Sequence, residues 1–199
     1  AQELAESVPS QVPGRESFFD HVHPNFAGNY RLARILAEAA AGFLPETVRR
    51  DAATDWASPE LCDRRLGLSD WNRYAVIETV LRRIADAPYT NQGTSLEDRR
   101  FFADQLAELR TRMTPDHYTN TYALYRAALN RRTNDFRLHE SFAEYLEAVG
   151  HWPGAVAEWQ AVRTLVPHHF AAYANLGRAL ARQGELEEAR RNLEIAARL

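Results

Sequence analysis

The chain has 199 residues, and all 24 of its basic side chains are arginine, because the sequence contains no lysine. This excludes the P-loop phosphate-binding signature and any mechanism that uses a lysine amine as base or nucleophile. The 27 acidic residues bring the net charge to −3, whereas nucleic-acid-binding proteins usually carry a basic domain or stripe. We therefore expect no nucleic-acid partner.

The composition favours an all-α protein. Alanine, the most frequent residue of the chain, and arginine both rank near the top of helix propensity. Six Arg-Arg pairs are expected to lie on solvated helix faces, paired with Asp or Glu at i±4. The single cysteine, Cys62, excludes an intrachain disulfide and a cysteine-based zinc site, so we expect neither a metal nor another cofactor.

We expect neither a membrane span nor a secretory signal peptide in this sequence. No apolar stretch approaches the ~18 residues of a membrane span. The first residues lack the basic and apolar regions of a signal peptide, and there is no initiator methionine. We therefore expect the sequence to be a piece of a longer protein, with no membrane span in this piece.

The first third of the chain predicts one amphipathic helix between two irregular segments. Residues 1–17 fit a short helical tail that ends in a Pro/Gly/Ser loop. From about Asn25 to Phe43, apolar residues follow helical spacing, with Leu32, Ile35 and Leu36 on the same stripe. Residues 45–57 are polar and predict an irregular linker.

Residues 58–135 predict helical pairs, because each expected helix begins with a capping residue. Proline in the first helical position and a Ser or Thr before it are typical of helix starts. The signals are Ser58-Pro59, Ser69, Ser95 and Thr114-Pro115, and Gly67 is expected to end the first of these helices.

The segment 136–199 contains two copies of one pattern. One constant shift aligns Phe142 with Leu176, Ala143 with Gly177, Leu146 with Leu180, Gly150 with Gly184 and Ala155 with Ala189. This period and these residue types resemble the tetratricopeptide repeat (TPR), a helix–turn–helix unit of about 34 residues. Residues 96–135 match more weakly, as degenerate copies. The resemblance implies a right-handed solenoid of helix pairs, and the alternative is an unrelated helical bundle.

The TPR resemblance also implies a binding groove for a protein or peptide partner. The groove positions are Arg137, Glu140, Glu144 and Glu147 in the first copy. In the second they are Ala171, Ala174, Arg178 and Ala181, and Arg182 and Asn175 lie beside them. The groove is therefore expected to be acidic on one repeat and basic on the next. TPR domains that bind a C-terminal carboxylate use lysine and asparagine here, and only Asn175 resembles that clamp. As alternatives, the groove is filled by the chain's own N-terminal helix or stays empty.

The histidines of this region are expected to have structural roles. His139 occupies the large-residue position of the first repeat copy, so we expect it to be packed. His168 and His169 fall at a repeat junction, where we expect them to be exposed.

A second motif precedes the first long helix. The run Asp20-His21-Val22-His23-Pro24-Asn25, with Gly28 three residues later, resembles the last motif block of the SGNH (GDSL-type) ester hydrolases, Asp-x-x-His-Pro-Asn-x-x-Gly. The resemblance covers residues 15–44 and implies that His23 is a general base that Asp20 orients and stabilises. The family's serine nucleophile lies in an earlier block, so we expect no ester hydrolysis by this chain alone.

Two other interpretations of this motif remain open. Asp20, His21 and His23 offer a His-x-His ligand spacing for a metal ion. Alternatively, the segment is an Asp/His turn that caps the helix at Asn25.

Together, the motifs predict four parts: a hydrolase-like remnant over residues 1–44, a linker over 45–57, helical pairs over 58–135 and two TPR-like repeats over 136–199. The expected function is protein–protein interaction or scaffolding within a larger SGNH-hydrolase-like protein. The alternative is an accessory region of an ester hydrolase or acyl-transfer enzyme that contributes the Asp20–His23 pair. By resemblance to bacterial families that join these modules, the protein is expected to be exported or periplasmic. The oligomeric state does not follow from the sequence.

Overall fold

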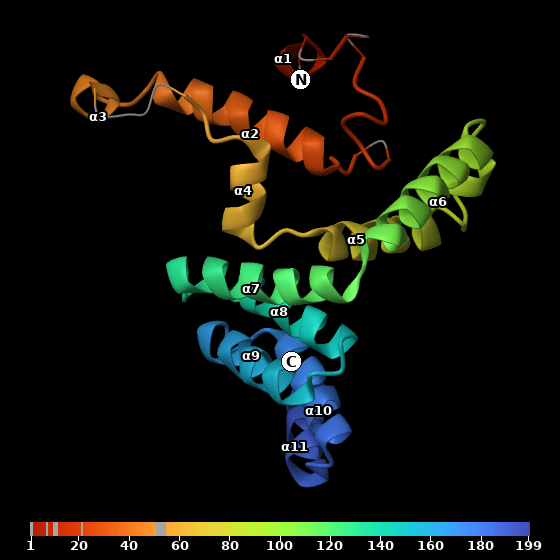
Figure 1. Ribbon diagram of the computed structural model, residues 1–199, viewed down its shortest axis with the longest axis vertical. Helices are drawn as coiled ribbons and strands as arrows, with labels where there is room; N and C mark the ends of the chain where they lie inside the picture. Colours follow the sequence, from red (N-terminus) through yellow and green to blue (C-terminus); the bar gives the residue numbers. More distant parts are fainter. Residues whose placement is uncertain (1, 7, 10–11, 21, 51–54) are drawn as a thin grey trace. The chain divides into compact units, whose positions relative to one another are not determined.

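A computed structural model of the chain describes residues 2–6, 8–9, 12–20, 22–50 and 55–199. The described residues form an all-α protein, as predicted, and their β pairing is limited to one isolated bridge between Phe18 and Pro24 (Figure 1). The helices are α1 (Gln2–Glu6), α2 (Phe26–Ala41), α3 (Glu46–Arg50), α4 (Pro59–Leu66), α5 (Asp70–Arg83), η1 (Tyr89–Asn91), α6 (Ser95–Arg112), α7 (Pro115–Arg131), α8 (Phe136–Ala148), α9 (Trp152–Leu165), α10 (Phe170–Gln183) and α11 (Leu186–Ala196).

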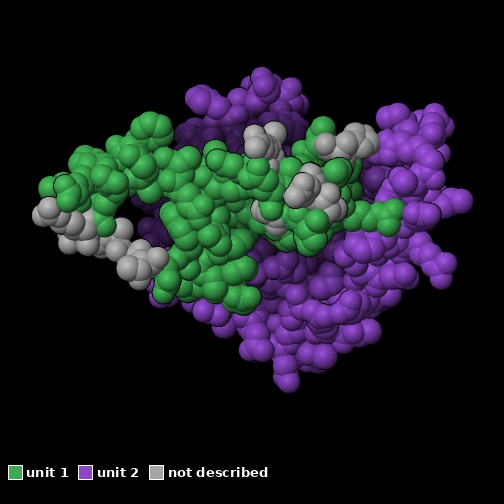
Figure 2. All heavy atoms as spheres, turned by 90° about the horizontal axis from the view of Figure 1, so that it is seen from above, with its two compact units in different colours: residues 1–62 green, residues 63–199 purple. Residues whose placement is uncertain are grey.

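The chain divides into two compact units, residues 1–62 and residues 63–199, which Figure 2 distinguishes by colour. The boundary falls inside α4. The first unit contains the Asp20–His23 motif, and the second contains the helix pairs with the expected groove positions.

Helix α2 is the main element of the first unit. It begins after Asn25, whose side-chain oxygen accepts a hydrogen bond from the Gly28 N–H at 2.9 Å, and this satisfies one free donor of the first turn. Its apolar stripe is only partly covered: Leu32 and Ile35 are half-buried, whereas Leu36 is 60% exposed. The helix was predicted correctly, but the described residues leave part of its stripe open.

The segment expected to be an irregular linker is partly helical. Residues 46–50 form α3, so the prediction is wrong there, and residues 51–54 lie outside the described residues. Glu46 in the first turn of α3 places a negative charge at the positive end of the helix dipole, which favours a short helix.

The capping signals of residues 58–135 are confirmed in most cases. The Ser58 hydroxyl accepts the Leu61 N–H at the start of α4, and Thr114 accepts the His117 N–H at the start of α7. At α5, the side-chain oxygen of Asn72 accepts the Ser69 N–H at 2.8 Å. Ser95 is not a cap, because α6 already begins with this residue and Thr94 precedes it as the N-cap.

Gly67 ends α4 for two reasons. Its φ of +69° lies in the left-handed region, which favours glycine. A Cβ atom at this position would lie 2.9 Å from Leu138 Cδ1 and 3.1 Å from Tyr125 Cδ1. The chain can therefore pass close to the core of the second unit only without a side chain here.

The core of the second unit is aromatic and continuous from α7 to α11, where each helix packs on the next. The ring of Tyr125 on α7 stacks on that of Phe142 on α8, with centroids 4.9 Å apart. Trp159 on α9 is fully buried in the same cluster. Burial of such large side chains dominates the stability of a helical array.

The helix pairs α8–α9 and α10–α11 bury residues at matching positions, one repeat length apart. The matched buried residues are Phe142 and Leu176, Ala143 and Gly177, Leu146 and Leu180, and Ala155 and Ala189. A Cβ atom on Gly177 would lie 2.7 Å from Leu193 Cγ, so the missing side chain allows α10 and α11 to approach closely. The right-handed solenoid stays a prediction.

A buried polar cluster joins α5, α7 and α8. The Asn72 amide donates to the Tyr125 hydroxyl at 2.6 Å and to the Ser141 hydroxyl at 3.0 Å, and the two hydroxyls are 2.8 Å apart. Burial raises the pKa of Tyr125 to about 12, although the hydrogen bonds from Ser141 and Asn72 oppose this. The phenol is therefore neutral at physiological pH and serves to fix the three helices.

Candidate functional site

The Asp20–His23 motif forms a closed turn in front of α2. The Asp20 carboxylate accepts the backbone N–H groups of Val22 and His23, each at 2.8 Å, with one oxygen. Its other oxygen accepts the His23 Nδ1–H at 2.7 Å. The side chain of Asp20 is only 6% exposed, whereas that of His23 is 54% exposed. The His23 imidazole is thus held through Nδ1, while the rest of the ring remains open to solvent.

This geometry keeps the Asp20 carboxylate charged. Burial by itself would raise the pKa of Asp20, but the hydrogen bonds from the Val22 and His23 amides and from the His23 ring outweigh it, and the pKa lies below its ordinary value. An ionised carboxylate at Nδ1 fixes the tautomer in which Nε2 can accept a proton. The pair therefore has the arrangement that a general base and its orienting acid require.

The turn is fastened to α2 through backbone contacts. The Asn25 N–H donates to the Ser17 carbonyl at 2.9 Å, and the Phe19 N–H donates to the His23 carbonyl at 2.9 Å. The Asn25 amide also donates to the Arg15 carbonyl at 2.7 Å. Asn25 is therefore both the N-cap of α2 and the residue that fastens the turn. The interpretation of the motif as a turn that caps the helix at Asn25 thus agrees with the hydrogen bond from the Gly28 N–H.

The described serines of this unit are engaged elsewhere. Ser17 is buried, and its hydroxyl accepts the Arg31 guanidinium at 2.8 Å; Ser58 caps α4. Neither is joined to His23. For the metal interpretation, His21 lies outside the described residues, and within the described ranges no group of three His, Cys, Asp or Glu side chains is close enough to hold a metal ion.

The acidic groove positions of α8 lie on one side of that helix. Glu140, Glu144 and Glu147 are spaced by four and three residues, which places them on one helical stripe. We call these three residues the acidic face. Arg137, the fourth predicted position, is exposed and pairs with Glu140 at 2.9 Å.

Both ends of the acidic face are bonded within the chain. Glu147 accepts the Trp159 indole N–H at 2.6 Å and the Arg178 guanidinium at 2.9 Å. Glu140, besides Arg137, lies 3.4 Å from the ring nitrogen of His169. His169 is therefore partly buried, and the expectation that it is exposed was wrong; His168 is exposed as expected.

Glu144, at the centre of the acidic face, differs from its neighbours. Among the described residues, no hydrogen bond or ion pair reaches its carboxylate, and the residue is exposed. Desolvation by the surrounding atoms raises the pKa of Glu144, and repulsion from Glu140 and Glu147 raises it further, against a smaller opposite effect of Arg178. The face thus holds one carboxylate that no described residue binds through a hydrogen bond or ion pair.

The predicted positions on α10 have different roles. Arg178 binds Glu147, and the Arg182 guanidinium lies over the Trp152 ring at 5.7 Å from its centroid. Asn175 is half-buried, and its amide makes no hydrogen bond with any described residue. The arginines of α10 therefore hold α10 against the preceding helix pair, which the sequence analysis missed. An indole N–H in a core position signals that a buried acceptor such as Glu147 is needed.

His139 forms a second link between α8 and its neighbours. Its Nδ1 lies 2.5 Å from the Glu158 carboxylate on α9, and its Nε2 donates to the Thr133 carbonyl at 3.0 Å. Because both partners only accept, this arrangement requires the doubly protonated ring. The hydrogen bond to Glu158 raises the pKa of His139, with the Thr133 bond and the Asp135 charge adding to it, while burial opposes it. The expectation of a packed histidine is confirmed.

We expect His139 to make stability depend on pH. Its folded-state pKa lies above the unfolded value of about 6.5, so its contribution is complete below pH ~6.5 and is lost as pH rises through the folded pKa. Urea unfolding of the wild type and of His139→Gln from pH 5.5 to 8.5 measures this. Their difference in unfolding free energy should shrink as pH rises. The exposed His168→Gln should leave the wild-type pH dependence unchanged, and a difference that grows with pH would refute the assignment.

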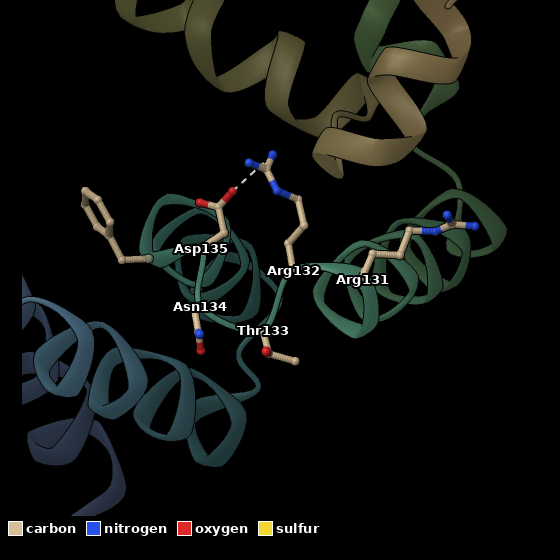
Figure 3. Close-up of a pocket in the computed structure, with 6 residues that line it drawn as sticks. Arg131, Arg132, Thr133, Asn134 and Asp135 are labelled. Atoms are coloured by element: carbon tan, nitrogen blue, oxygen red, sulfur yellow. Dashed lines mark ion pairs between the residues drawn. The ribbon is translucent and has the colours of Figure 1, made fainter. Parts of the chain in front are cut away.

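A hollow of about 500 Å³ at the junction of α7 and α8 contains an Arg-Arg pair (Figure 3). Arg132 turns toward Asp135, with 3.4 Å between nitrogen and oxygen, and Figure 3 shows the Arg131 guanidinium pointing away from them. The two arginines therefore do not form a common basic surface. In two other Arg-Arg pairs, one arginine pairs with an acid four residues away, as predicted: Arg82 with Glu78 at 3.9 Å, and Arg190 with Glu194.

These observations define the chain as an all-α protein built of packed helix pairs. Compared with models of known protein families and with curated proteins, the sequence gives no match. In the described ranges, no helix combines the length and the apolar character needed to cross a membrane.

Proposed function

We propose that the helix pairs form a protein-interaction module of the tetratricopeptide type, which binds a protein or peptide partner through the acidic face of α8. The observation that carries this proposal is the exposed Glu144 carboxylate, which has no hydrogen bond or ion pair with any described residue and lies between Glu140 and Glu147, which are already bonded within the chain. The buried positions that α8–α9 and α10–α11 share, one repeat length apart, support the repeat assignment and its right-handed solenoid.

The partner should present a basic side chain to Glu144. Charge-assisted hydrogen bonds to a carboxylate are about twice as strong as neutral ones, and the guanidinium of Arg178 already shows this mode at Glu147. An acidic partner would instead meet three carboxylates on the same helix stripe. The proposed ligand is therefore a peptide segment with arginine or lysine.

Titration with two synthetic peptides tests this proposal. They share an alanine-rich sequence, and one carries three arginines where the other carries three glutamates. The arginine peptide should bind the chain, and Glu144→Gln should weaken its binding about tenfold, as expected for one charge-assisted contact. The effect should fade at high salt.

Glu187→Gln on the exposed start of α11 is the matched control, since it removes the same charge away from the acidic face. Equal binding of the two peptides, or an equal effect of both substitutions, would exclude the acidic face as the recognition surface.

A second candidate function rests on the 2.7 Å hydrogen bond between Asp20 and His23. We propose as the alternative that this pair is the general base and orienting acid of an SGNH-type ester hydrolase or acyl-transfer enzyme. The serine nucleophile would then come from a domain that the resemblance places ahead of this segment. In this case the helical region is an accessory that shapes access to the site.

The alternative is tested in a longer protein that joins this chain to such a domain. His23→Ala should abolish hydrolysis of a small acyl ester, a loss of at least ~10³-fold, because the serine loses its base. His168→Ala is the control and should retain activity. Unchanged hydrolysis by His23→Ala would remove the hydrolase interpretation and leave the acidic face as the functional surface.

A further inference from the structure

Asp20 and His23 lie at the tip of a short hairpin that precedes α2. The two sides of this hairpin are joined by one antiparallel bridge and by two backbone hydrogen bonds of 2.9 Å, one on each side of the bridge. The bridge and the two hydrogen bonds join Phe18 to Pro24, Phe19 to His23 and Ser17 to Asn25. The contact between the Asp20 carboxylate and the His23 ring therefore depends on this hairpin staying closed.

A hairpin of this size needs support from outside itself. A two-stranded hairpin alone in water is marginally stable at best, because it has few hydrogen bonds and little buried area. The 2.7 Å contact between Asp20 and His23 thus requires that the hairpin be fastened to a stable element. Asn25 provides one such contact, since its side-chain amide donates to the Arg15 carbonyl at 2.7 Å.

Arg31, in the second turn of α2, provides another. One guanidinium nitrogen donates to the Glu16 carbonyl at 3.0 Å and to the Ser17 hydroxyl at 2.8 Å. Ser17 is fully buried, and its hydroxyl donates in turn to the Glu16 carboxylate at 3.2 Å. Hydrogen bonds from a charged donor are stronger than those between neutral groups. Arg31 therefore binds the base of the hairpin through both a backbone atom and a buried side chain.

The neighbouring arginine of the same helix makes a different contact. Arg34, three residues later, donates to Glu38 at 2.7 Å within α2 itself. Arg31 lies three residues after Gly28, the residue on which the Ser17 carbonyl rests, so both face the hairpin. Of these two arginines, it is Arg31 that connects α2 to the hairpin.

We propose that Arg31 is a positioning residue for the Asp20–His23 pair: through Glu16 and Ser17 it keeps the hairpin closed on α2, and the closed hairpin keeps the His23 Nδ1–H on Asp20. The use of this pair in catalysis rests on the ester-hydrolase alternative proposed above. The motif Asp-x-x-His-Pro-Asn-x-x-Gly ends at Gly28, so the sequence pattern does not include Arg31.

Nitrogen NMR of the His23 ring in the complete chain tests the proposal, at about pH 8.5, where an ordinary histidine is neutral. In the wild type the proton should lie on Nδ1, because Asp20 accepts it, whereas a ring without such a partner populates both tautomers. Arg31→Gln should raise the share of the Nε2–H tautomer about tenfold, as expected for the loss of one charge-assisted contact. Ser17→Ala leaves the Glu16 carbonyl as acceptor and should cause a smaller rise.

Arg34→Gln is the matched control, because it removes the same charge from the same helix without touching the hairpin. Its His23 spectrum should equal that of the wild type. An unchanged His23 ring in Arg31→Gln, or an equal change in Arg34→Gln, would overturn the proposal. Circular dichroism verifies folding. Should Arg31→Gln lose its helical spectrum, Ser17→Ala decides, and an unchanged ring in that variant would count against Arg31.

Kinetics in a longer protein that joins this chain to a hydrolase domain separate this proposal from the function on which it rests. Arg31→Gln should lower kcat for a small acyl ester about tenfold and leave KM unchanged, because the pair acts on the serine and not on substrate binding. A raised KM with unchanged kcat would contradict a positioning role. Absence of hydrolysis in the wild type would refute the hydrolase alternative, whereas the His23 spectra would still decide whether Arg31 holds the pair.

Discussion

Replacing Trp159 by alanine should lower the free energy of unfolding by ~3–5 kcal/mol, the range for deleting a fully buried large aromatic side chain. Trp159 lies at the centre of the aromatic core, and its indole N–H donates to Glu147 at 2.6 Å. Alanine leaves a cavity and removes this donor at the same time. Urea unfolding followed by far-UV circular dichroism measures the change.

Two further variants divide this loss into its parts. Trp159→Phe keeps an aromatic ring but no N–H, so Glu147 keeps only Arg178 as its partner; a cost of ~1–3 kcal/mol is expected for the lost donor. Phe170→Ala, at a large exposed side chain on α10, should change stability by less than ~0.5 kcal/mol. If Trp159→Ala were as mild as Phe170→Ala, the packing of α8 on α9 described above would be wrong.

The second large effect is expected at Gly28, in the first turn of α2. A Cβ atom at this position would lie 1.9 Å from the Ser17 carbonyl oxygen and 2.9 Å from the Ser17 carbonyl carbon. Both contacts are with backbone atoms, so no side-chain rotation relieves them. Gly28→Ala should cost at least ~3 kcal/mol locally, at the upper end for overpacking.

We expect this cost to appear as detachment of the Asp20–His23 turn from α2. The Asn25 N–H, which donates to the Ser17 carbonyl, should then exchange with solvent at least ~100-fold faster. NMR hydrogen exchange at Asn25 measures this. Gly93→Ala is the control, because its added methyl group would meet nothing within 4 Å. Unchanged exchange in Gly28→Ala would show that the turn does not rest on the helix as described.

The Gly28 contact also explains part of the motif Asp-x-x-His-Pro-Asn-x-x-Gly in this chain. Asn25 anchors the turn and caps the helix, and Gly28 leaves room for the turn to lie on it. These two residues thus hold the turn that carries Asp20 and His23 against α2. The sequence pattern pointed to the pair; the contact with Ser17 became visible only in three dimensions.

Several features of the fold follow from the sequence because they depend on residues a few positions apart. Helix starts at Ser58-Pro59 and Thr114-Pro115 are set by side chains that bond to the next turn. The hydrogen bond from His23 to Asp20 also spans only three residues. Such contacts form wherever the local sequence allows them, so motif and spacing are sufficient to predict them.

The pairing of the acidic face was decided by tertiary structure. Glu147 accepts hydrogen bonds from Trp159 on α9 and Arg178 on α10, and Glu140 lies within ion-pair distance of His169. Of the three glutamates, only Glu144 has no such contact with a described residue. Helical spacing alone places the three glutamates on one side of α8, and it does not say which helix lies opposite them. The pKa of Glu144 is raised by desolvation and by the charges of Glu140 and Glu147 on the same helix.

The sequence by itself thus determined the all-α class, most helix ends and the position-by-position correspondence of α8–α9 with α10–α11, since these rest on composition, capping and spacing. Tertiary structure alone decided which apolar faces are covered. Trp159 is buried in the core where α10 lies against its helix, whereas Leu193, at the matching position, and Leu36 on the stripe of α2 stay exposed. Burial depends on the neighbour that a surface meets, and a helix carries the same apolar pattern with or without that neighbour.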